Sequence, residues 1–451
     1  MSRLMLRALP LLTVLAAGPA LAETVAITGA RIETVSSAGT IPAGVIVIKD
    51  GKIAAVGPQV PVPAGARVID AAGKVVTPGL IAPSTNLGVA ELQQVRSTRD
   101  DHPGEALSAG FDVQYGVNPA STLIPLARDG GVTRIVVTPD PSGSGEGTDE
   151  ETAGSVDYTA SGPRTGADPV LFTGQPAVVS LAAGDADPVL RAKVAVSLDL
   201  GQAGAVNAGG SRGSAMVLVR SALDDARDYA KNQAAFERGA TRPYGLSRVD
   251  LEALVPVVEG KIPLLVRVHR ASDIRQVLKL GADEKIKLIL EGAEEGWIVA
   301  ADLAKAGVPV LIDTEADLPD QFETLGSRLD NAARLQAAGV VVAIEGSREF
   351  YNLRQERFNA GTAVGNGLPY QAALAAITLN PARIWGFGER AGSIEPGKDA
   401  DLVIWSGDPL ETTTYPVAVL IGGQVQPTSS RAQELRDRYL NPDTTYPPAY
   451  H

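Results

Sequence analysis

Histidine and carboxylate residues at the ends of apolar runs are the side chains of this sequence best suited to chemistry. His269 follows the apolar run Ile262–Val268, and Glu291 follows the run Ile286–Leu290. Imidazole groups exchange protons near neutral pH, and a positioned carboxylate acts as a base or as a metal ligand. Side chains of these two types, each at the end of a predicted strand, could therefore take part in acid–base or metal chemistry. The structural alternative for His269 is a histidine that only hydrogen-bonds its neighbours.

A hydrolytic metal site needs several imidazoles or carboxylates around one water molecule, whose pKa the metal lowers toward neutrality. The chain has only three histidines, His102, His269 and His451. A cation could bind to His269 together with Glu291 and Glu345, but no short-spaced pair of ligands anchors such a site. The sequence favours a site with no cofactor. One divalent cation, Zn or Mn, held by His269 and Glu291 is the alternative.

The glycine-rich stretch 139–160 is predicted to be an exposed acidic loop. It is expected to form neither an anion-binding site nor the turn of a serine nucleophile. Its glycines could surround an anion, but Glu146 and Asp149 would repel one. Gly143-Ser144-Gly145 lies within this loop and follows no predicted strand, so it does not form the sharp turn that presents a serine nucleophile.

The composition is that of an acidic globular protein. The chain has 451 residues, of which 45% are hydrophobic and 20% charged, and its net charge is −12. We do not expect nucleic-acid binding, because neutralising the phosphates of a nucleic acid requires basic patches on the protein. The length accommodates an α/β barrel, which often exceeds 200 residues as a single domain.

The first 22 residues are typical of a signal peptide. Arg3 and Arg7 precede the apolar run Ala8–Ala17, and Ala20-Leu21-Ala22 has the small-x-small pattern of a cleavage site. The apolar run is too short to anchor the protein in a membrane. We expect cleavage after Ala22 and a periplasmic or secreted protein. The absence of cysteine excludes a disulfide and a lipid attached to cysteine.

Both ends of the chain are rich in predicted β-structure, and the part between them alternates strands with helices. Residues 24–76 contain short alternating strands, with a hairpin signal at Asp50-Gly51. Such alternation indicates a parallel sheet, closed as a barrel or, alternatively, open and doubly wound. The predicted elements of the central part include helix Ser121–Gly131, strand Val132–Thr138, helix Ala215–Arg238, helix Leu251–Glu259, strand Ile262–Val268, helix Ala271–Leu280, strand Ile286–Leu290, helix Trp297–Ala306, strand Val308–Ile312, helix Asn331–Ala338 and strand Val340–Ile344.

Three ordered segments resemble the amidohydrolase superfamily, and within it the imidazolonepropionase-like and prolidase-like members. They are Val75–Gly88 (V-V-T-P-G-L-I-A-P-S-T-N-L-G), Phe358–Pro381 with its Thr378-Leu379-Asn380-Pro381, and Ala391–Trp405 (A-G-S-I-E-P-G-K-D-A-D-L-V-I-W). The resemblance implies a (β/α)8 TIM-type barrel over residues 78–391. It also implies a composite β-sandwich, built from residues 23–77 and 392–451.

The resemblance also assigns positions in the site. The superfamily carries a His-x-His metal-binding pair after the first barrel strand, where this chain has Ser84 and Asn86. The strand-5 histidine corresponds to His269, the strand-6 histidine to Glu291, and the aspartate after strand 8 to Ser347. The usual metal site is therefore not intact. Beyond these matched positions, Asn331 and Arg354 are near predicted mouth loops and could orient a polar ligand, with helix capping as the alternative.

The resemblance implies a hydrolase that acts on C–N bonds, non-peptide or in small peptides, of a small polar molecule at the barrel mouth. It implies His269 and Glu291 as the catalytic residues, with Glu291 as metal ligand or base. The predicted pocket residues are Ser84, Asn86, Ser347, Asn331 and Arg354. The alternative to a hydrolase is a catalytically degenerate member that binds a small molecule or a partner protein at the barrel mouth. Bound metal would distinguish a conventional enzyme of the family from a binding protein. We expect no nucleic-acid or membrane partner, and the sequence leaves a homo-oligomer open.

Overall fold

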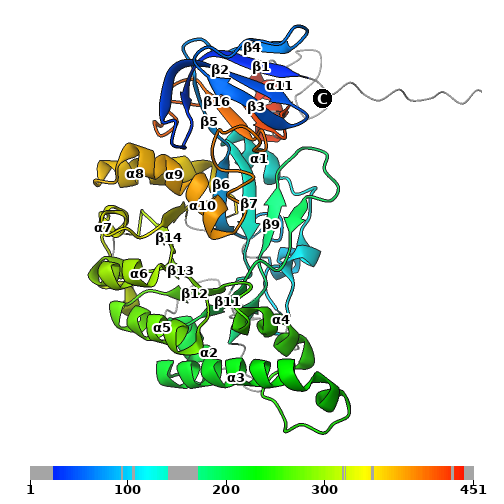
Figure 1. The fold of residues 1–451 in the computed structure, drawn as a ribbon, viewed down its shortest axis with the longest axis vertical. Helices are drawn as coiled ribbons and strands as arrows, with labels where there is room; N and C mark the ends of the chain where they lie inside the picture. The colour runs from blue at the N-terminus through cyan, green and yellow to red at the C-terminus, as the bar shows by residue number, and fades with distance from the viewer. Residues whose placement is uncertain are drawn as a thin grey trace, which may run out of the picture.

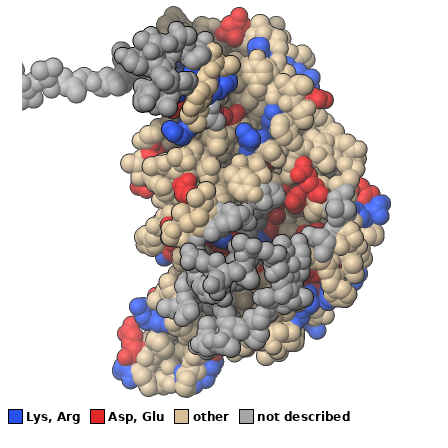
Figure 2. All heavy atoms as spheres, turned by 180° about the vertical axis from the view of Figure 1, so that it is seen from behind, with Lys and Arg blue, Asp and Glu red and all other residues tan. Residues whose placement is uncertain are grey.

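The computed structural model describes residues 24–92, 95–103, 107–140, 171–316, 319, 321–346, 350–427 and 431–440. Residues 1–22 and most of the predicted loop 139–160 lie outside these ranges, so the expectations for them stay predictions. Within the described chain, no helix combines the length and apolar character needed to cross a membrane. On the face shown in Figure 2, lysine and arginine side chains are scattered among aspartate and glutamate side chains.

An eight-stranded sheet joins the two ends of the chain, at the top of Figure 1. β5 is the link, because it pairs in parallel with β1 and antiparallel with β16, where Val76 lies opposite Ile404. Alternate apolar residues of these strands, such as Ile27 and Leu402, form a core of their own. The strands are β1 (Val25–Glu33), β2 (Thr40–Lys49), β3 (Lys52–Gly57), β4 (Arg67–Asp70), β5 (Val75–Pro78), β16 (Leu402–Trp405), β17 (Pro416–Ile421) and β18 (Gln424–Val425).

The α/β body lies below this composite sheet and begins at β6, one residue after β5. Its strands form a four-stranded and a six-stranded sheet. β6 pairs in parallel with β7, and β11 to β15 form an unbroken parallel series. These strands are β6 (Leu80–Thr85), β7 (Val132–Val137), β11 (Val196–Asp199), β12 (Leu264–Val268), β13 (Leu288–Gly292), β14 (Val310–Asp313) and β15 (Val342–Glu345).

An antiparallel segment lies between the two parallel series and departs from the expected (β/α)8 pattern. β8 (Phe172–Gly174) pairs antiparallel with β11, and β9 (Ala177–Ser180) pairs antiparallel with β7. Pro176 lies between them, and proline cannot donate a backbone hydrogen bond, so the ladder is interrupted there. β10 (Val189–Arg191) pairs with the outer side of β9. The described body is therefore a mixed α/β structure with seven parallel strands and three short antiparallel strands, β8, β9 and β10.

The two sheets enclose one interior. A single apolar cluster unites Val136 of β7, Val178 of β9, Leu265 of β12 and Ile289 of β13 with the indole of Trp385. Leu311 of β14 and Ala343 of β15 belong to the same cluster, which we call the interior cluster. β15 also lies beside β6, although no strand pairing between them is present in the described residues. The strands thus surround a common core, as side chains fill the inside of a small barrel.

Helices cover the outside of the body, and α3 and α4 lie at the end far from the composite sheet (Figure 1). The long predicted helix is confirmed as α3, whose first residue follows Ser211; the Ser211 hydroxyl accepts a hydrogen bond from the Ser214 backbone. The helices are α1 (Ile124–Asp129), α2 (Gln202–Asn207), α3 (Arg212–Glu237), α4 (Arg248–Val258), α5 (Ala271–Glu284), α6 (Ala300–Ala306), α7 (Asn331–Ala337), α8 (Glu356–Gly365), α9 (Tyr370–Ala376), α10 (Leu379–Ile384) and α11 (Arg431–Leu440), with short 3-10 turns η1 (Arg96–Thr98), η2 (Val113–Gly116), η3 (Gly296–Val299), η4 (Phe322–Thr324) and η5 (Leu353–Gln355).

Candidate functional site

A layer of polar side chains lies two residues beyond the interior cluster along the parallel strands. Side chains alternate between the two faces of a strand, so residues i and i+2 point the same way. Leu265 and Ile289 belong to the interior cluster, and the residues two positions later are Arg267 and Glu291. The same step leads from Ala343 to Glu345. We call Arg267, Glu291, Asp313 and Glu345, with Asp199 on β11, the polar layer.

Arg267 and Glu291 form an ion pair at the centre of this layer. They are directly paired residues of β12 and β13, and Arg267 Nη2 lies 3.3 Å from Glu291 Oε2. Burial lowers the pKa of Arg267, but the negative charges of Glu291 and Asp199 outweigh burial and leave the pKa above its ordinary value. The guanidinium is therefore a permanent positive charge inside the body.

Ser84 contacts the second oxygen of Glu291. Its hydroxyl donates to Glu291 Oε1 over 2.6 Å and lies 2.7 Å from the hydroxyl of Thr138. Ser84 lies near the end of β6 and Thr138 follows β7, both strands of the four-stranded sheet, whereas Glu291 lies on β13 of the six-stranded sheet. The hydrogen bond between Ser84 and Glu291 therefore joins the two sheets. Both carboxylate oxygens of Glu291 are thus engaged, one by a cation and one by a hydroxyl.

Glu345 is a buried carboxyl group whose surroundings raise its pKa. Its side chain is buried at the end of β15, and its Oε2 has no hydrogen-bond partner within the described part of the chain. Burial raises the pKa of Glu345 well above its ordinary value, and the neighbouring charge of Glu291 raises it further. A neutral carboxyl can donate a hydrogen bond, which a carboxylate cannot.

Asn86 lies two residues after Ser84, in a separate polar cluster. Its Nδ2 donates to Asp101 Oδ2 over 2.6 Å and lies 3.4 Å from Asp140 Oδ2. Arg99 forms ion pairs with both aspartates, and His102 lies 3.0 Å from Asp101. These contacts account for Asn86 as part of a cluster that fixes the segment after β6 against the end of β7.

His269 lies beyond the polar layer, at the end of β12. Its Nδ1 is 2.6 Å from Glu294 Oε2, and its Nε2 is 3.8 Å from Glu323 Oε1. The imidazole is 16% exposed. Burial lowers the pKa of His269, but the hydrogen bond to Glu294 and the charges of Glu294 and Glu323 raise it above its ordinary value overall. The pair has the form of an imidazole oriented by a carboxylate, with the second ring nitrogen facing outward to another acid.

The turn after β13 brings Glu294 back to His269. Gly292 and Ala293 both have positive φ, at 88° and 52°. A side chain on Gly292 would place its Cβ 2.8 Å from His269 Nδ1, so only glycine leaves room for the imidazole. Asn331 at the start of α7 donates to the carbonyls of Ala293 and Glu294 over 2.9 and 3.1 Å. The side chain of Asn331 therefore holds this turn rather than a ligand.

Glu323 is fixed from the other side. Its Oε2 accepts hydrogen bonds from the Gln202 backbone over 2.7 Å and from Arg212 over 2.9 Å. Asp199 accepts from the backbone of Gly201 over 2.7 Å and of Gly204 over 3.1 Å. The start of α2 therefore orders two of the acids that surround His269 and Arg267.

Comparisons with known proteins identify the fold. A model of the amidohydrolase family matches residues 216–429. The structure of an amidohydrolase from Thermotoga maritima MSB8 is similar with a TM-score of 0.75 and 22% identity, covering 89% of this chain and 99% of that one. Molinate hydrolase gives a TM-score of 0.54 and 20% identity, over 94% of this chain and 98% of that one.

The amidohydrolase family model thus covers just under half of the chain, and the solved structures share its fold.

Two further comparisons set the extent of the likeness. A putative prolidase from Bifidobacterium longum is similar with a TM-score of 0.51 and 17% identity, over 93% of this chain and 99% of that one. The curated amidohydrolase tasK of Hapsidospora irregularis is 52% identical over 60 residues, which are 13% of this chain and 6% of tasK. At these identities the solved structures show that this chain shares their fold, and they do not establish its activity.

The metal implied by the family does not fit the residues present. Within the described residues, no three histidine, cysteine, aspartate or glutamate side chains are grouped so that they could hold an ion. The two positions that the resemblance assigns to the His-x-His pair hold Ser84 and Asn86, and both are hydrogen-bonded to acids. Glu291 contacts Ser84 and Arg267, whereas His269 contacts Glu294. His269 and Glu291 therefore belong to two different sets of contacts.

The remaining predicted site residues lie elsewhere. Ser347 lies outside the described residues. Arg354 packs against Gly130, in the turn before β7, and thus at the opposite end of the strands from Ser84. Sequence reasoning missed Arg267, Glu294 and Glu323. Strand alternation could have found Arg267, because in V-R-V-H it precedes His269 by two residues and shares its face.

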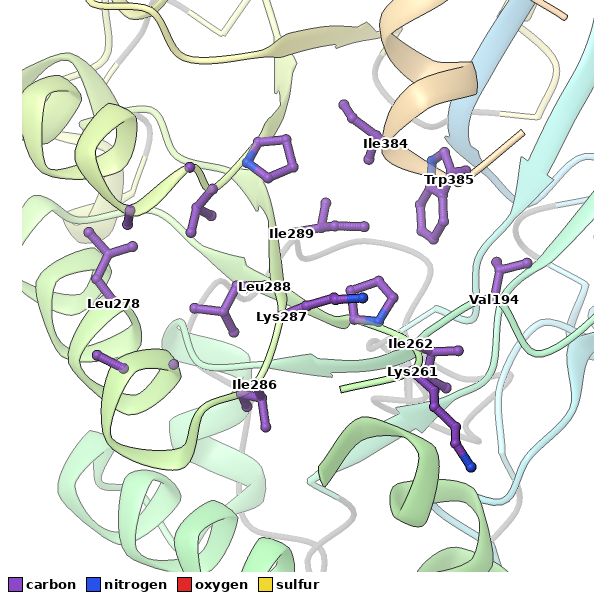
Figure 3. A pocket seen from close by; sticks show the side chains of 18 of the residues that line it. Val194, Lys261, Ile262, Leu278, Ile286, Lys287, Leu288, Ile289, Ile384 and Trp385 are labelled. Carbon is purple, nitrogen blue, oxygen red and sulfur yellow. The ribbon is translucent and has the colours of Figure 1, made fainter. Parts of the chain in front are cut away.

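A cavity of about 570 Å³ opens at the amino-terminal ends of β12 to β14 (Figure 3). Ile289 and Trp385 extend toward each other at its inner side, where the interior cluster closes it off from the polar layer. Its charged lining residues are Arg191, Lys261 and Lys287. This lining contains neither an imidazole nor a carboxylate for acid–base chemistry, so we place the candidate site at the other end of the strands.

Proposed function

We propose that this protein is a member of the amidohydrolase superfamily, a hydrolase that cleaves a C–N bond, non-peptide or in a small peptide, of a small polar molecule, and that it needs no divalent metal. The observation that carries the proposal is the His269–Glu294 pair at the end of β12. An imidazole whose Nδ1 is fixed by a carboxylate has its Nε2 oriented for proton transfer. The proposed family membership supplies the reaction class.

In the proposed reaction, a water molecule adds to the carbonyl carbon of the C–N bond. Unprotonated His269 takes one proton from that water and later gives it to the departing nitrogen, so that the products are a carboxylic acid and an amine. The 3.8 Å between His269 Nε2 and Glu323 Oε1 is too long for a direct hydrogen bond, so Glu323 does not occupy the ring nitrogen that acts on the water. Glu294 stabilises the imidazolium that forms during the transfer.

A binding protein without catalysis is the second candidate, and one observation favours it. Ser84 and Asn86 occupy the positions that the resemblance assigns to the metal-binding histidines and are hydrogen-bonded to Glu291 and Asp101. Such a site would bind a small polar molecule at the carboxyl ends of the strands and release it unchanged. A divalent cation between His269 and Glu291 also stays a proposal, although their separate contacts do not support it.

Two finer expectations accompany the proposal. We propose that the two sheets close into a barrel of the family's type, supported by the single interior cluster and by the neighbouring positions of β15 and β6. We also propose export with cleavage after Ala22. Amino-terminal sequencing of the mature protein tests the cleavage, and a mature chain that starts at Met1 would contradict it.

Hydrolysis assays with and without a chelator separate the candidates. The substrates should include Xaa-Pro dipeptides, N-acyl amino acids, thiocarbamates and phenylureas, with product amines measured by chromatography. We expect turnover that EDTA leaves unchanged and that His269→Ala abolishes. Substrate binding without turnover by the folded wild-type protein would favour the binding protein. Turnover lost in EDTA and restored by Zn²⁺ or Mn²⁺ would contradict the metal-free mechanism.

A further inference from the structure

The register of the sheet places an arginine level with Glu291, a position that the resemblance assigns to a metal ligand. Family resemblance assigns His269 and Glu291 to the ligand positions of two adjacent strands. In the structure, however, Glu291 is paired with Arg267, and the residue paired with Gly292 is Val268. His269 follows the last paired residue. The side chain level with Glu291 on β12 is therefore a guanidinium, not an imidazole.

The contacts of Glu291 leave it no free oxygen for a metal. Oε2 faces Arg267 at 3.3 Å, and Oε1 accepts the Ser84 hydroxyl at 2.6 Å. Ser84 itself occupies one position that the resemblance assigns to the His-x-His pair. Two of the family's ligand positions thus contact each other directly, and a third polar group, Arg267, completes the cluster. None of these contacts requires a metal ion between the side chains.

The charges around Arg267 are those that a metal site would need. Glu291, Asp199, Asp140 and Glu345 all act on the guanidinium. A divalent ion placed among these acids would lie close to a permanent positive charge and be repelled by it. The guanidinium of Arg267, which is part of the chain, therefore already supplies the positive charge that balances these acids.

We propose that Arg267 takes the place of the metal ion, so that the site works with a fixed guanidinium and binds no divalent cation. Its side chain keeps 20% of its surface exposed although it points into the body. An electron-rich oxygen of a ligand can therefore reach the guanidinium, which donates hydrogen bonds in a planar fork. The proposed contact between Arg267 and a ligand rests on the proposed function. The proposed exclusion of a divalent cation rests on the structure alone.

Metal content and melting temperature test the inference without any turnover, so a failure of the proposed hydrolysis leaves the test intact. The tag-free wild-type protein should be incubated with Zn²⁺ or Mn²⁺, dialysed and analysed for metal by mass spectrometry. We expect no metal above the level of a protein blank. One ion per chain that disappears in Glu291→Gln would overturn the proposal.

The variant Arg267→Ala provides a second test, because it leaves Glu291 without its positively charged partner. We expect a lower melting temperature, most of which methylguanidinium restores by entering the vacated space. The wild-type protein and the matched control Arg270→Ala, an arginine that pairs with Asp273 outside the layer, should show no such recovery. An unchanged melting temperature in Arg267→Ala, or an equal response of the control to methylguanidinium, would contradict the role of Arg267. Should the variant fail to fold, the metal analysis of the wild-type protein still decides.

Discussion

At the scale of single residues, the site depends on which charge each side chain carries. The positive charge of Arg267 is permanent, burial and the charge of Glu291 raise the pKa of Glu345, and the pKa of His269 is raised by Glu294 and Glu323 despite burial. Each of these states is set by neighbours that are far away in the sequence. The residue types alone would give an ordinary arginine, glutamate and histidine.

Glu294→Gln should shift the pH dependence of hydrolysis. The base is unprotonated His269, so kcat/KM falls as pH drops through the raised pKa of the imidazole. Removing the charge of Glu294 lowers that pKa, and the acidic limb should move to lower pH by about one unit or more. The measurement is kcat/KM against pH. Glu295→Gln is the control, because Glu295 accepts from Ala271 and Gly326 and leaves His269 untouched; an equal shift there would refute the role of Glu294.

Glu356→Gln should stabilise the protein. Glu356 is fully buried, neither of its oxygens has a hydrogen-bond partner among the described residues, and burial raises its pKa well above the ordinary value. A raised acid pKa means that the native state binds the proton more tightly than the unfolded chain. The free energy of unfolding therefore falls as pH rises above the unfolded-state pKa.

The expected gain from Glu356→Gln is about 2 kcal/mol at neutral pH, as expected for removing an uncompensated buried acid. It should shrink below pH 4, where both states carry the proton. Denaturant unfolding at pH 4 and pH 8 measures both values. A variant that is less stable than the wild-type protein at pH 8 would show that Glu356 has a favourable partner.

At the scale of elements, the turn after β13 is the device that positions the His269–Glu294 pair. Gly292→Ala should lower both stability and activity, because alanine disfavours a φ of 88° and its Cβ would lie 2.8 Å from His269 Nδ1. We expect a loss of about 1 kcal/mol from the backbone alone, with more from the displaced imidazole. Activity and thermal unfolding are measured together.

Gly307→Ala is the matched control for this prediction. Gly307 ends α6 with a φ of 64°, and no atom lies within 4 Å of the position of its Cβ. It should lose a similar backbone contribution to stability and keep its activity. If both variants lose activity to the same degree, the turn after β13 has no special role in holding His269.

Strand and helix periodicity predicted the second half of the body well, because β12 to β15 alternate regularly with helices. It could not predict β8 and β9, whose short buried strands flank Pro176 and follow a stretch with the composition of a loop. The partners of His269 were also beyond its reach. Choosing between Glu291 and Glu294 requires the pairing of β12 with β13 and the positive φ of two residues, and neither is encoded in a local pattern.

At the scale of the whole molecule, a buried ion cluster connects the composite sheet to the α/β body. Arg134 on β7 donates to Asp401 over 2.6 Å and to Asp399 over 2.8 Å, both next to β16. The Asp401 carboxylate also accepts the backbone of Gly422. Both aspartates lie in the family-like segment Ala391–Trp405, and the structure shows that they join the composite sheet to the α/β body.

Arg134→Ala should destabilise the protein strongly. It would leave two carboxylates without their buried partner, for which we expect a cost of about 3–5 kcal/mol. Arg390 offers a control, since it contacts the same Asp399 at 3.1 Å but is 62% exposed. Its replacement by alanine should cost less than about 1 kcal/mol. Urea unfolding gives both values, and similar losses for the two variants would contradict a special role of the buried cluster.

The pairing of β5 with β16 also governs the order in which the protein can fold. Val76 meets Ile404 across more than two-thirds of the chain, so the composite sheet cannot be completed until its last strands have been synthesised. Until then the edge of β5 is open to pairing with other chains. Contacts between such distant segments slow folding and prolong the exposure of incomplete sheets. β5 is thus made long before the strand that becomes its final neighbour, β16.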